Sequence, residues 1–65
     1  MNKQEAVDAM KEGHKVAHSN FSSDEWMMRG GRGIIFEDGC QCSPSEFWQY
    51  RTEDWWDTGW RIVDV

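Results

Sequence analysis

The chain has 65 residues and a formal net charge of −5, with twelve Asp and Glu against seven Lys and Arg. This length allows a single domain, 1–65, that buries only about 60% of the surface its unfolded form exposes. The acidic balance argues against direct nucleic-acid binding, which needs a basic face, and fits binding to a basic protein surface. The longest apolar run, Ile34-Ile35-Phe36, is too short for a secretion signal or a membrane span. We therefore expect a soluble intracellular protein with no membrane partner.

The first residues predict a helix over residues 3–12. Asn2 can act as N-cap, with Glu5 at the position that completes a capping box. Gly13 follows where a left-handed residue commonly ends a helix. Apolar residues recur at helical spacing and predict the buried side: Ala6, Val7, Ala9 and Met10.

Short strands are predicted to follow. Residues 14–18 and 25–29 alternate in polarity, and Gly30-Gly31 predicts a hairpin turn into a return strand over residues 32–37. Asp38-Gly39 indicates a second turn, after which residues 40–42 can form a further short strand.

The second half begins with the strongest local signal in the chain. Ser43 is a predicted N-cap, Pro44 suits the first helical position, and Glu46 can complete the capping box of a short helix that ends near Arg51. A polar loop over residues 52–58 and a closing strand over residues 59–65 complete the order. The expected fold class is α+β, with an antiparallel sheet of about four strands packed on the N-terminal helix and a second short helix.

The cysteines and histidines do not predict a metal site or a catalytic pair. Cys40 and Cys42 are too close for the usual C-x2-C zinc hook, and His14 and His18 lie far upstream. A disulfide between the two cysteines would close a strained ring, so we expect reduced thiols. No third group or glycine-rich elbow is present to orient a cysteine nucleophile.

Other enzymatic motifs are also missing. Glu37 and Asp38 are adjacent and would point to opposite sides of a strand, which makes a poor acid–base pair. Residues 30–33, Gly-Gly-Arg-Gly, lack the lysine and the following helix of a phosphate-binding loop. We therefore predict a non-enzymatic protein with no cofactor.

Aromatic residues are unusually abundant, with five Trp, three Phe and one Tyr. A small core accommodates two or three such rings, so we expect the others to lie partly exposed, where Trp, Tyr and Arg dominate binding hot spots. Trp60, on the closing strand, is the predicted core residue, and adjacent Trp55 and Trp56 cannot easily both be buried. The predicted binding residues are Trp48, Tyr50, Arg51, Trp55 and Trp56.

The two ends of the chain resemble a group of small phage proteins. EAVDAMKEGHKV (residues 5–16) is similar to their opening EAL-x-AL-K-x-G-K-K-V, and GWRIV (residues 59–63) is similar to their ending DW-x-I-V. The group includes the sponges of the second Thoeris anti-defence type and anti-CRISPR relatives. The resemblance implies a compact α+β unit that oligomerises in the host cytoplasm. Residues 21–26 and 43–51 have no counterpart, so no ligand-binding residue is carried over.

Three functions follow from these patterns. The first is a phage accessory protein that inhibits a bacterial defence system or host machine by stoichiometric protein binding. The alternative is a sponge that sequesters a cyclic nucleotide immune signal, with Arg29, Arg32 or Arg51 holding phosphates. The third is a self-associating structural protein. A marginal core and exposed indoles also favour a homo-oligomer.

Overall fold

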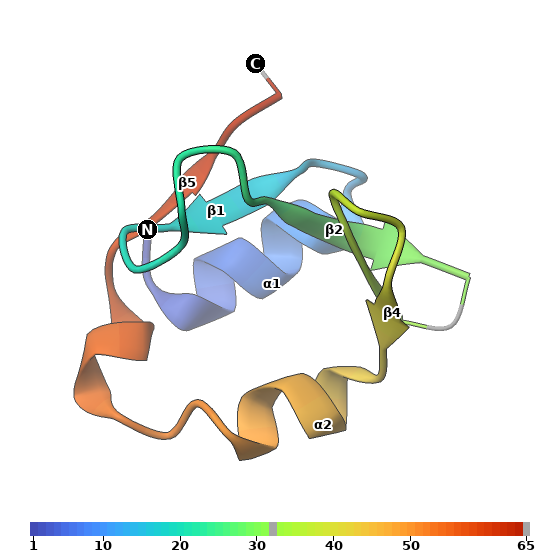
Figure 1. Ribbon diagram of the computed structural model, residues 1–65. Coiled ribbons are helices and arrows are strands. Elements are labelled where there is room, and N and C mark those ends of the chain that lie inside the picture. The colour runs from blue at the N-terminus through green and yellow to red at the C-terminus, as the bar shows by residue number, and fades with distance from the viewer. Residues whose placement is uncertain (32, 65) are drawn as a thin grey trace.

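The computed structural model describes residues 1–31 and 33–64. Along the chain its elements are α1 (Lys3–Lys11), β1 (Val16–His18), β2 (Met27–Gly30), β3 (Gly33–Phe36), β4 (Gln41–Cys42), α2 (Pro44–Gln49), the 3-10 helix η1 (Asp54–Asp57) and β5 (Trp60–Ile62). All strand pairs are antiparallel and the sheet order is β4-β3-β2-β1-β5. The predicted α+β fold is confirmed, with α1 packed on the sheet and α2 below both in Figure 1. The sheet has five strands rather than about four, because residues 41–42 do pair with β3.

Helix α1 has the predicted capping box. Asn2 Oδ1 accepts from the backbone N–H of Glu5 at 2.8 Å, and Glu5 Oε1 accepts from the N–H of Asn2 at 2.9 Å. The helix ends at Lys11, one residue early, and Gly13 follows with a φ of 97°. None of the helices in the described ranges is long and apolar enough to cross a membrane.

The strands are shorter than predicted. β1 begins at Val16, so His14 precedes the strand, and β2 begins at Met27. Gly30 still pairs with Gly33, so the hairpin turn follows Gly30 rather than including it. A Cβ at Gly30 would collide with the Ile35 side chain, so a larger residue there would force Ile35 to move. The predicted start of the return strand, Arg32, lies outside the described residues.

In the second half of the chain, α2 begins where predicted, but both α2 and β5 end earlier than predicted. Ser43 Oγ accepts from the N–H of Glu46 at 3.2 Å and Pro44 opens α2, but the return bond from Glu46 is not among the hydrogen bonds of the described residues. α2 ends at Gln49 because Arg51 N–H bonds back only three residues, to the Trp48 carbonyl. The predicted loop contains η1. β5 stops at Ile62, and Val65 lies outside the described residues.

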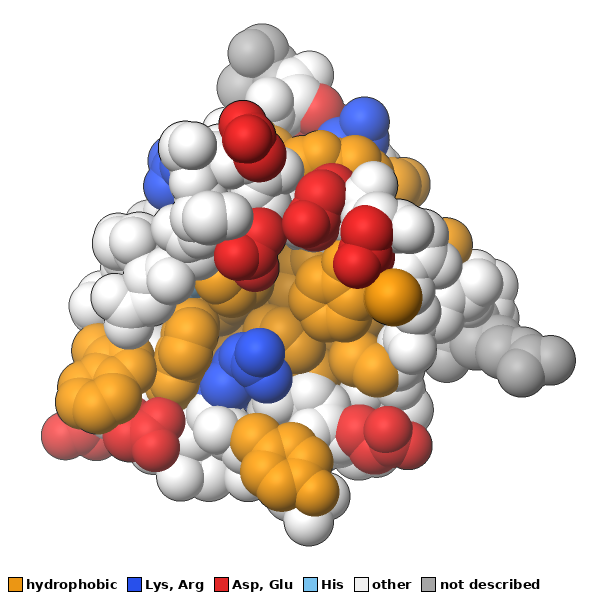
Figure 2. All heavy atoms as spheres, in the orientation of Figure 1, with side chains coloured by type: hydrophobic (Ala, Val, Ile, Leu, Met, Phe, Trp, Pro, Cys, Tyr) orange, Lys and Arg blue, Asp and Glu red, His pale blue; other side chains and the backbone are white. Residues whose placement is uncertain are grey.

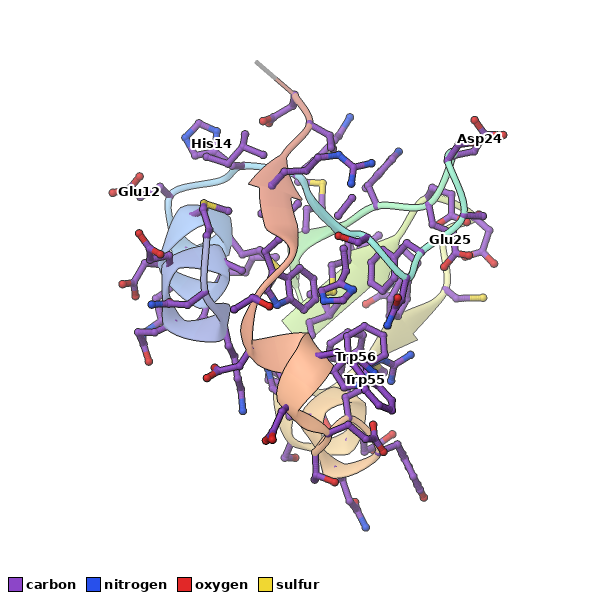
Figure 3. The ribbon with its side chains drawn as sticks, turned by 90° about the vertical axis from the view of Figure 1, so that its left-hand side faces the viewer. Glu12, His14, Asp24, Glu25, Trp55 and Trp56 are labelled. Atoms are coloured by element: carbon purple, nitrogen blue, oxygen red, sulfur yellow. The ribbon has the colours of Figure 1, made fainter. Side chains whose placement is uncertain are left out.

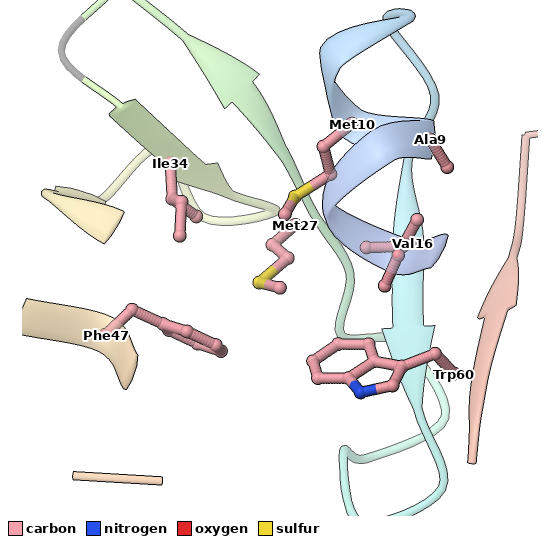
Figure 4. Close-up of a cluster of buried hydrophobic side chains, with 8 residues drawn as sticks. Ala9, Met10, Val16, Met27, Ile34, Phe47 and Trp60 are labelled. Atoms are coloured by element: carbon pink, nitrogen blue, oxygen red, sulfur yellow. The ribbon is translucent and has the colours of Figure 1, made fainter. Parts of the chain in front are cut away.

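The core lies between α1, the sheet and α2. It is formed by Ala6, Ala9, Met10, Val16, Met27, Ile34, Phe47 and Trp60. Figure 4 shows Phe47 and Trp60 pointing toward one another from α2 and β5. Trp60 is only 3% exposed, as predicted. Its indole is thus the largest side chain of the core cluster and joins the closing strand to the rest of the core.

Replacing Trp60 by Ala should destabilise the domain by about 3–5 kcal/mol, because a cavity is left at the centre of the core. A domain of this size has little stability to spare, so the variant should be largely unfolded. Urea denaturation followed by circular dichroism measures the effect. Trp55→Ala is the matched control and should lower the free energy of unfolding by less than about 1 kcal/mol; equal losses in the two variants would contradict this division of core from surface.

Candidate functional site

Most of the surplus aromatic rings form one continuous layer beneath the sheet. Neighbouring ring centroids lie 4.4–6.3 Å apart, mostly tilted or edge-on, as aromatic pairs prefer. The members are His18, Phe21, Phe36, Phe47, Trp48, Trp56 and Trp60. Trp26 lies apart and is half-buried under the Lys15 ammonium group, 4.4 Å from its ring centroid. Phe47 and Trp60 are the buried aromatic residues among those described, and the other rings are partly exposed, as expected. Edge-on contacts let the half-buried rings pack around the buried Trp60 indole.

His18 is the residue that the sequence interpretation missed. It is not among the predicted binding residues, yet it is only 2% exposed and lies against Trp56 and Trp60. Its Nδ1 accepts from the Asn20 N–H at 3.0 Å, which places the proton on Nε2. Nε2–H donates to the carbonyls of Trp55 at 2.8 Å and Thr58 at 2.6 Å. His18 is assigned a structural role because its hydrogen-bond acceptors lie in a distant segment of the chain, which the sequence alone does not reveal.

These bonds fix η1 against the core. The Trp60 indole N–H also donates to the Trp56 carbonyl, at 2.7 Å. Successive η1 carbonyls are thus held by two buried side chains of β1 and β5, and the two η1 indoles differ in burial. Trp56 is half-buried on the core, whereas Trp55 is 56% exposed. This confirms that the adjacent indoles are not both buried.

Arg51 lies between the rings of Phe47 and Trp56. Its guanidinium carbon is 4.0 Å from the Phe47 ring centroid and 5.4 Å from that of Trp56. Nη1 donates to the Phe47 carbonyl at 3.2 Å, and the buried Nε has no hydrogen-bond partner. Among the described residues no carboxylate lies within ion-pairing distance of this guanidinium. Arg51 is therefore a positioned cation with unused donors.

An apolar hollow of about 250 Å³ adjoins Arg51. It is lined by Phe36, Cys42, Glu46, Phe47, Tyr50 and Arg51. Figure 2 shows this face as an orange depression that contains a basic side chain. Tyr50, the C-cap residue of α2, lies at the edge of the hollow and is 75% exposed. We call Phe36, Phe47, Tyr50, Arg51, Trp55 and Trp56 the Arg51 face.

Acidic side chains surround this face. Figure 2 shows Asp and Glu grouped along one side of the depression and at its lower corners. Figure 3 shows Asp24 and Glu25 on the same side of the molecule as Trp55 and Trp56, with Glu12 on the opposite side. Glu46 lines the hollow, and Glu53 accepts from the Trp56 indole N–H at 3.0 Å. The face therefore combines one cation and several rings with a negative rim.

The predicted binding residues separate into two groups. Tyr50, Arg51, Trp55 and Trp56 contribute to the Arg51 face. Trp48 instead packs half-buried in the core, 5.6 Å from the Trp60 ring centroid and 4.5 Å from the Lys3 ammonium group. It borders the opposite side of Arg51, where a second hollow is lined by Lys3, Trp48, Arg51, Thr52, Glu53, Asp54, Trp56 and Asp57. Trp48 is thus mainly a support for the site.

The histidines are held in hydrogen bonds, and the cysteine thiols have raised pKa values. Both ring nitrogens of His18 bond to backbone groups, and His14 Nδ1 lies 3.3 Å from Asp64 Oδ1. Residues 1–31 and 33–64 contain no group of three or more ligands placed to hold a metal ion. Hydrogen bonding to the Asp38 carboxylate raises the pKa of the Cys40 thiol, and burial raises the pKa of Cys42. The described thiols are therefore free but poorly ionised at neutral pH.

Replacing His18 by Phe should test its structural role. Phe preserves the ring volume but leaves the Trp55 and Thr58 carbonyls and the Asn20 N–H without their partner, which costs about 1–3 kcal/mol. Urea denaturation measures the loss, and near-ultraviolet circular dichroism reports the mobility of the indoles. His14→Phe is the control, because its exposed bond to Asp64 contributes at most about 1 kcal/mol. Similar losses in both variants would exclude the proposed anchoring of η1.

Asp38→Asn should make Cys40 more reactive toward iodoacetamide near neutral pH. The substitution keeps an oxygen for the Cys40 N–H but removes the negative charge that raises the thiol pKa. Because the thiolate is the nucleophile, the rate–pH profile should shift to lower pH. The experiment uses a Cys42→Ser background. Glu37→Gln, which removes a weaker influence on Cys40, should shift the profile less, and a larger shift in that variant would contradict the assignment.

The comparisons with known proteins do not assign the chain to a family. No family model matches it, and neither a curated protein nor a solved structure matches it significantly. The function is therefore inferred from the geometry of the Arg51 face and its surroundings.

Proposed function

We propose that this protein is a non-enzymatic inhibitor that binds a protein partner stoichiometrically through the Arg51 face. The partner contributes an apolar side chain to the hollow, a carboxylate or carbonyl group to Arg51, and basic side chains to the acidic rim. Trp, Tyr and Arg on one face are the residues that dominate protein-binding hot spots.

The state of Arg51 is the observation that carries this proposal. A chain with twelve acids could easily neutralise one arginine, yet the described residues leave its guanidinium without a carboxylate. The two flanking rings hold the guanidinium in place, so little conformational entropy is lost when an acceptor binds. The unpaired Nε is covered by the protein, so an acceptor from a partner would bind the terminal Nη groups, of which Nη1 also bonds to the Phe47 carbonyl.

The dimensions and charge of the face favour a protein over a nucleotide. The hollow of about 250 Å³ opens widely to solvent and suits one inserted side chain, whereas small-molecule sites enclose most of their ligand. A cyclic nucleotide would bring its phosphates close to the acidic rim, which opposes binding. A partner with a basic surface is attracted by the same rim and by the net charge of −5.

The same rim disfavours a second copy of the chain on this face, because two acidic rims would repel. The homo-oligomer that the sequence predicts would therefore use another surface, and a monomeric mass by light scattering would contradict that expectation. The resemblance of the chain's ends supports a phage accessory role, in which the partner belongs to a bacterial defence system or host machine in the host cytoplasm.

Trp55→Ala and Arg51→Gln should each weaken partner binding by about 10- to 30-fold, the effect of losing a hot-spot residue of about 1.4–2 kcal/mol. Tagged wild-type protein is used to capture its partner from bacterial lysate. The affinity of each purified variant for that partner is then measured by calorimetry. Arg61→Gln, a change at an exposed arginine of β5, is the matched control and should bind like wild type.

A partner that binds both face variants as tightly as wild type would contradict the proposal. A thermal-shift screen against cyclic di- and oligonucleotides tests the alternative. A ligand present at about 100 times its dissociation constant raises the free energy of unfolding by about 2.7 kcal/mol, which the melting temperature would reveal. A shift that Arg51→Gln abolishes would replace protein inhibition with nucleotide sequestration.

A further inference from the structure

A further pocket, separate from the two hollows beside Arg51, lies between α1, the β2–β3 hairpin and the start of α2. It has a volume of about 300 Å³ and is lined by Val7, Met10, Lys11, Arg29, Gly30, Gly31, Gly33, Ile34, Pro44 and Trp48. Among the described residues its walls are mostly apolar side chains, and the two charged residues that line it, Lys11 and Arg29, have the same sign. An apolar pocket with a few convergent polar groups is the usual form of a small-molecule site.

The charge of this pocket opposes that of the whole chain. Lys11 and Arg29 have no ion-pair partner among the described residues, although the chain carries twelve acids. Helix α1 separates its charges: Val7 and Lys11 line the pocket at i and i+4, and Lys3, one turn earlier, lies over the Trp48 ring. The acids Glu5, Asp8 and Glu12 recur at i, i+3 and i+7 on another side. The pocket is therefore a local positive region on an acidic protein.

The glycine wall gives a ligand close access to the backbone. A Cβ at Gly30 would collide with Ile35, and a Cβ at Gly33 would lie 2.9 Å from the Cys42 carbonyl oxygen, so packing explains these two glycines. A Cβ at Gly31 would meet nothing within 4 Å, and it borders open space in the pocket. Position 31 can therefore carry a side chain that tests the pocket without disturbing the fold.

We infer that this pocket binds a small organic anion. The apolar or aromatic body of the ligand lies on Val7, Met10 and Trp48, and its phosphate or carboxylate group lies between Lys11 and Arg29. Charge-assisted hydrogen bonds to two cations supply the selectivity for an anion, and the apolar walls supply the contact area. The Arg51 face and its protein partner are not required for this binding.

The test uses four probes that vary one feature at a time. Binding of 2-naphthyl phosphate, 2-naphthoate, 2-naphthol and inorganic phosphate is followed by ¹H–¹⁵N NMR of the full chain. The first two should bind saturably and shift the backbone amides of Gly30 and Gly31 and the indole N–H of Trp48. Naphthol lacks the charge and phosphate lacks the ring, so each should bind at least about tenfold more weakly than the better naphthyl anion. The preference between the two anions identifies the head group.

Two variants locate the anion. Lys11→Gln combined with Arg29→Gln should weaken binding of the better anion by at least about tenfold, because both charge-assisted contacts are lost. Gly31→Glu should weaken it similarly by placing a negative charge in the open space. Arg51→Gln and Arg61→Gln are the matched controls and should bind like wild type. Thermal denaturation of each variant confirms that it remains folded.

The other outcomes would overturn the inference. One is that naphthol binds as tightly as the anions. Another is that the NMR signals of Tyr50 and Trp55 shift instead of those of the pocket. The third is that Arg61→Gln weakens anion binding as much as the Lys11→Gln and Arg29→Gln double variant. Absence of saturable binding by both naphthyl anions would overturn it as well.

Discussion

The arrangement depends on two buried N–H groups that hold the carbonyl side of η1. His18 and Trp60 project from neighbouring strands, and their side chains donate to the carbonyls of Trp55, Trp56 and Thr58. A single 3-10 turn has few backbone hydrogen bonds of its own and would otherwise be more mobile. Since the sheet sets the positions of both donors, it also sets where η1 lies and which indole points outward.

The aromatic layer compensates for the small number of side chains that a short chain can bury. A 65-residue chain cannot bury many aliphatic side chains, and this one contains no leucine at all. Large rings supply much contact area for each residue that must be ordered. Rings at the edge of such a layer are only half covered, and Arg51 lies on two of them. The packed aromatic rings that stabilise the domain therefore also form, at their half-covered edge, a surface suited to binding.

Local signals in the sequence predicted what depends on local chemistry. Asn2, Ser43 and Pro44 located the helix starts because capping involves residues three positions apart. A simple argument about adjacent rings predicted that Trp55 and Trp56 are not both buried, but it did not identify Trp55 as the exposed one. The anchoring role of His18 could not be predicted, because its acceptors lie 37 and 40 residues away in sequence. Trp48 was placed in the site for the same reason, since its contacts with Trp60 and Lys3 form only in the folded chain.

The tethering of η1 by distant side chains also bears on how the surface could be used outside this protein. An isolated peptide of residues 44–57 would contain Tyr50, Arg51 and both η1 indoles, but not the donors that position them. Such a peptide would lose conformational entropy when it became ordered on its partner, whereas in the intact domain the segment is ordered before binding. Transplanting the surface onto another scaffold would therefore require the strand-borne histidine and tryptophan as well as the segment itself.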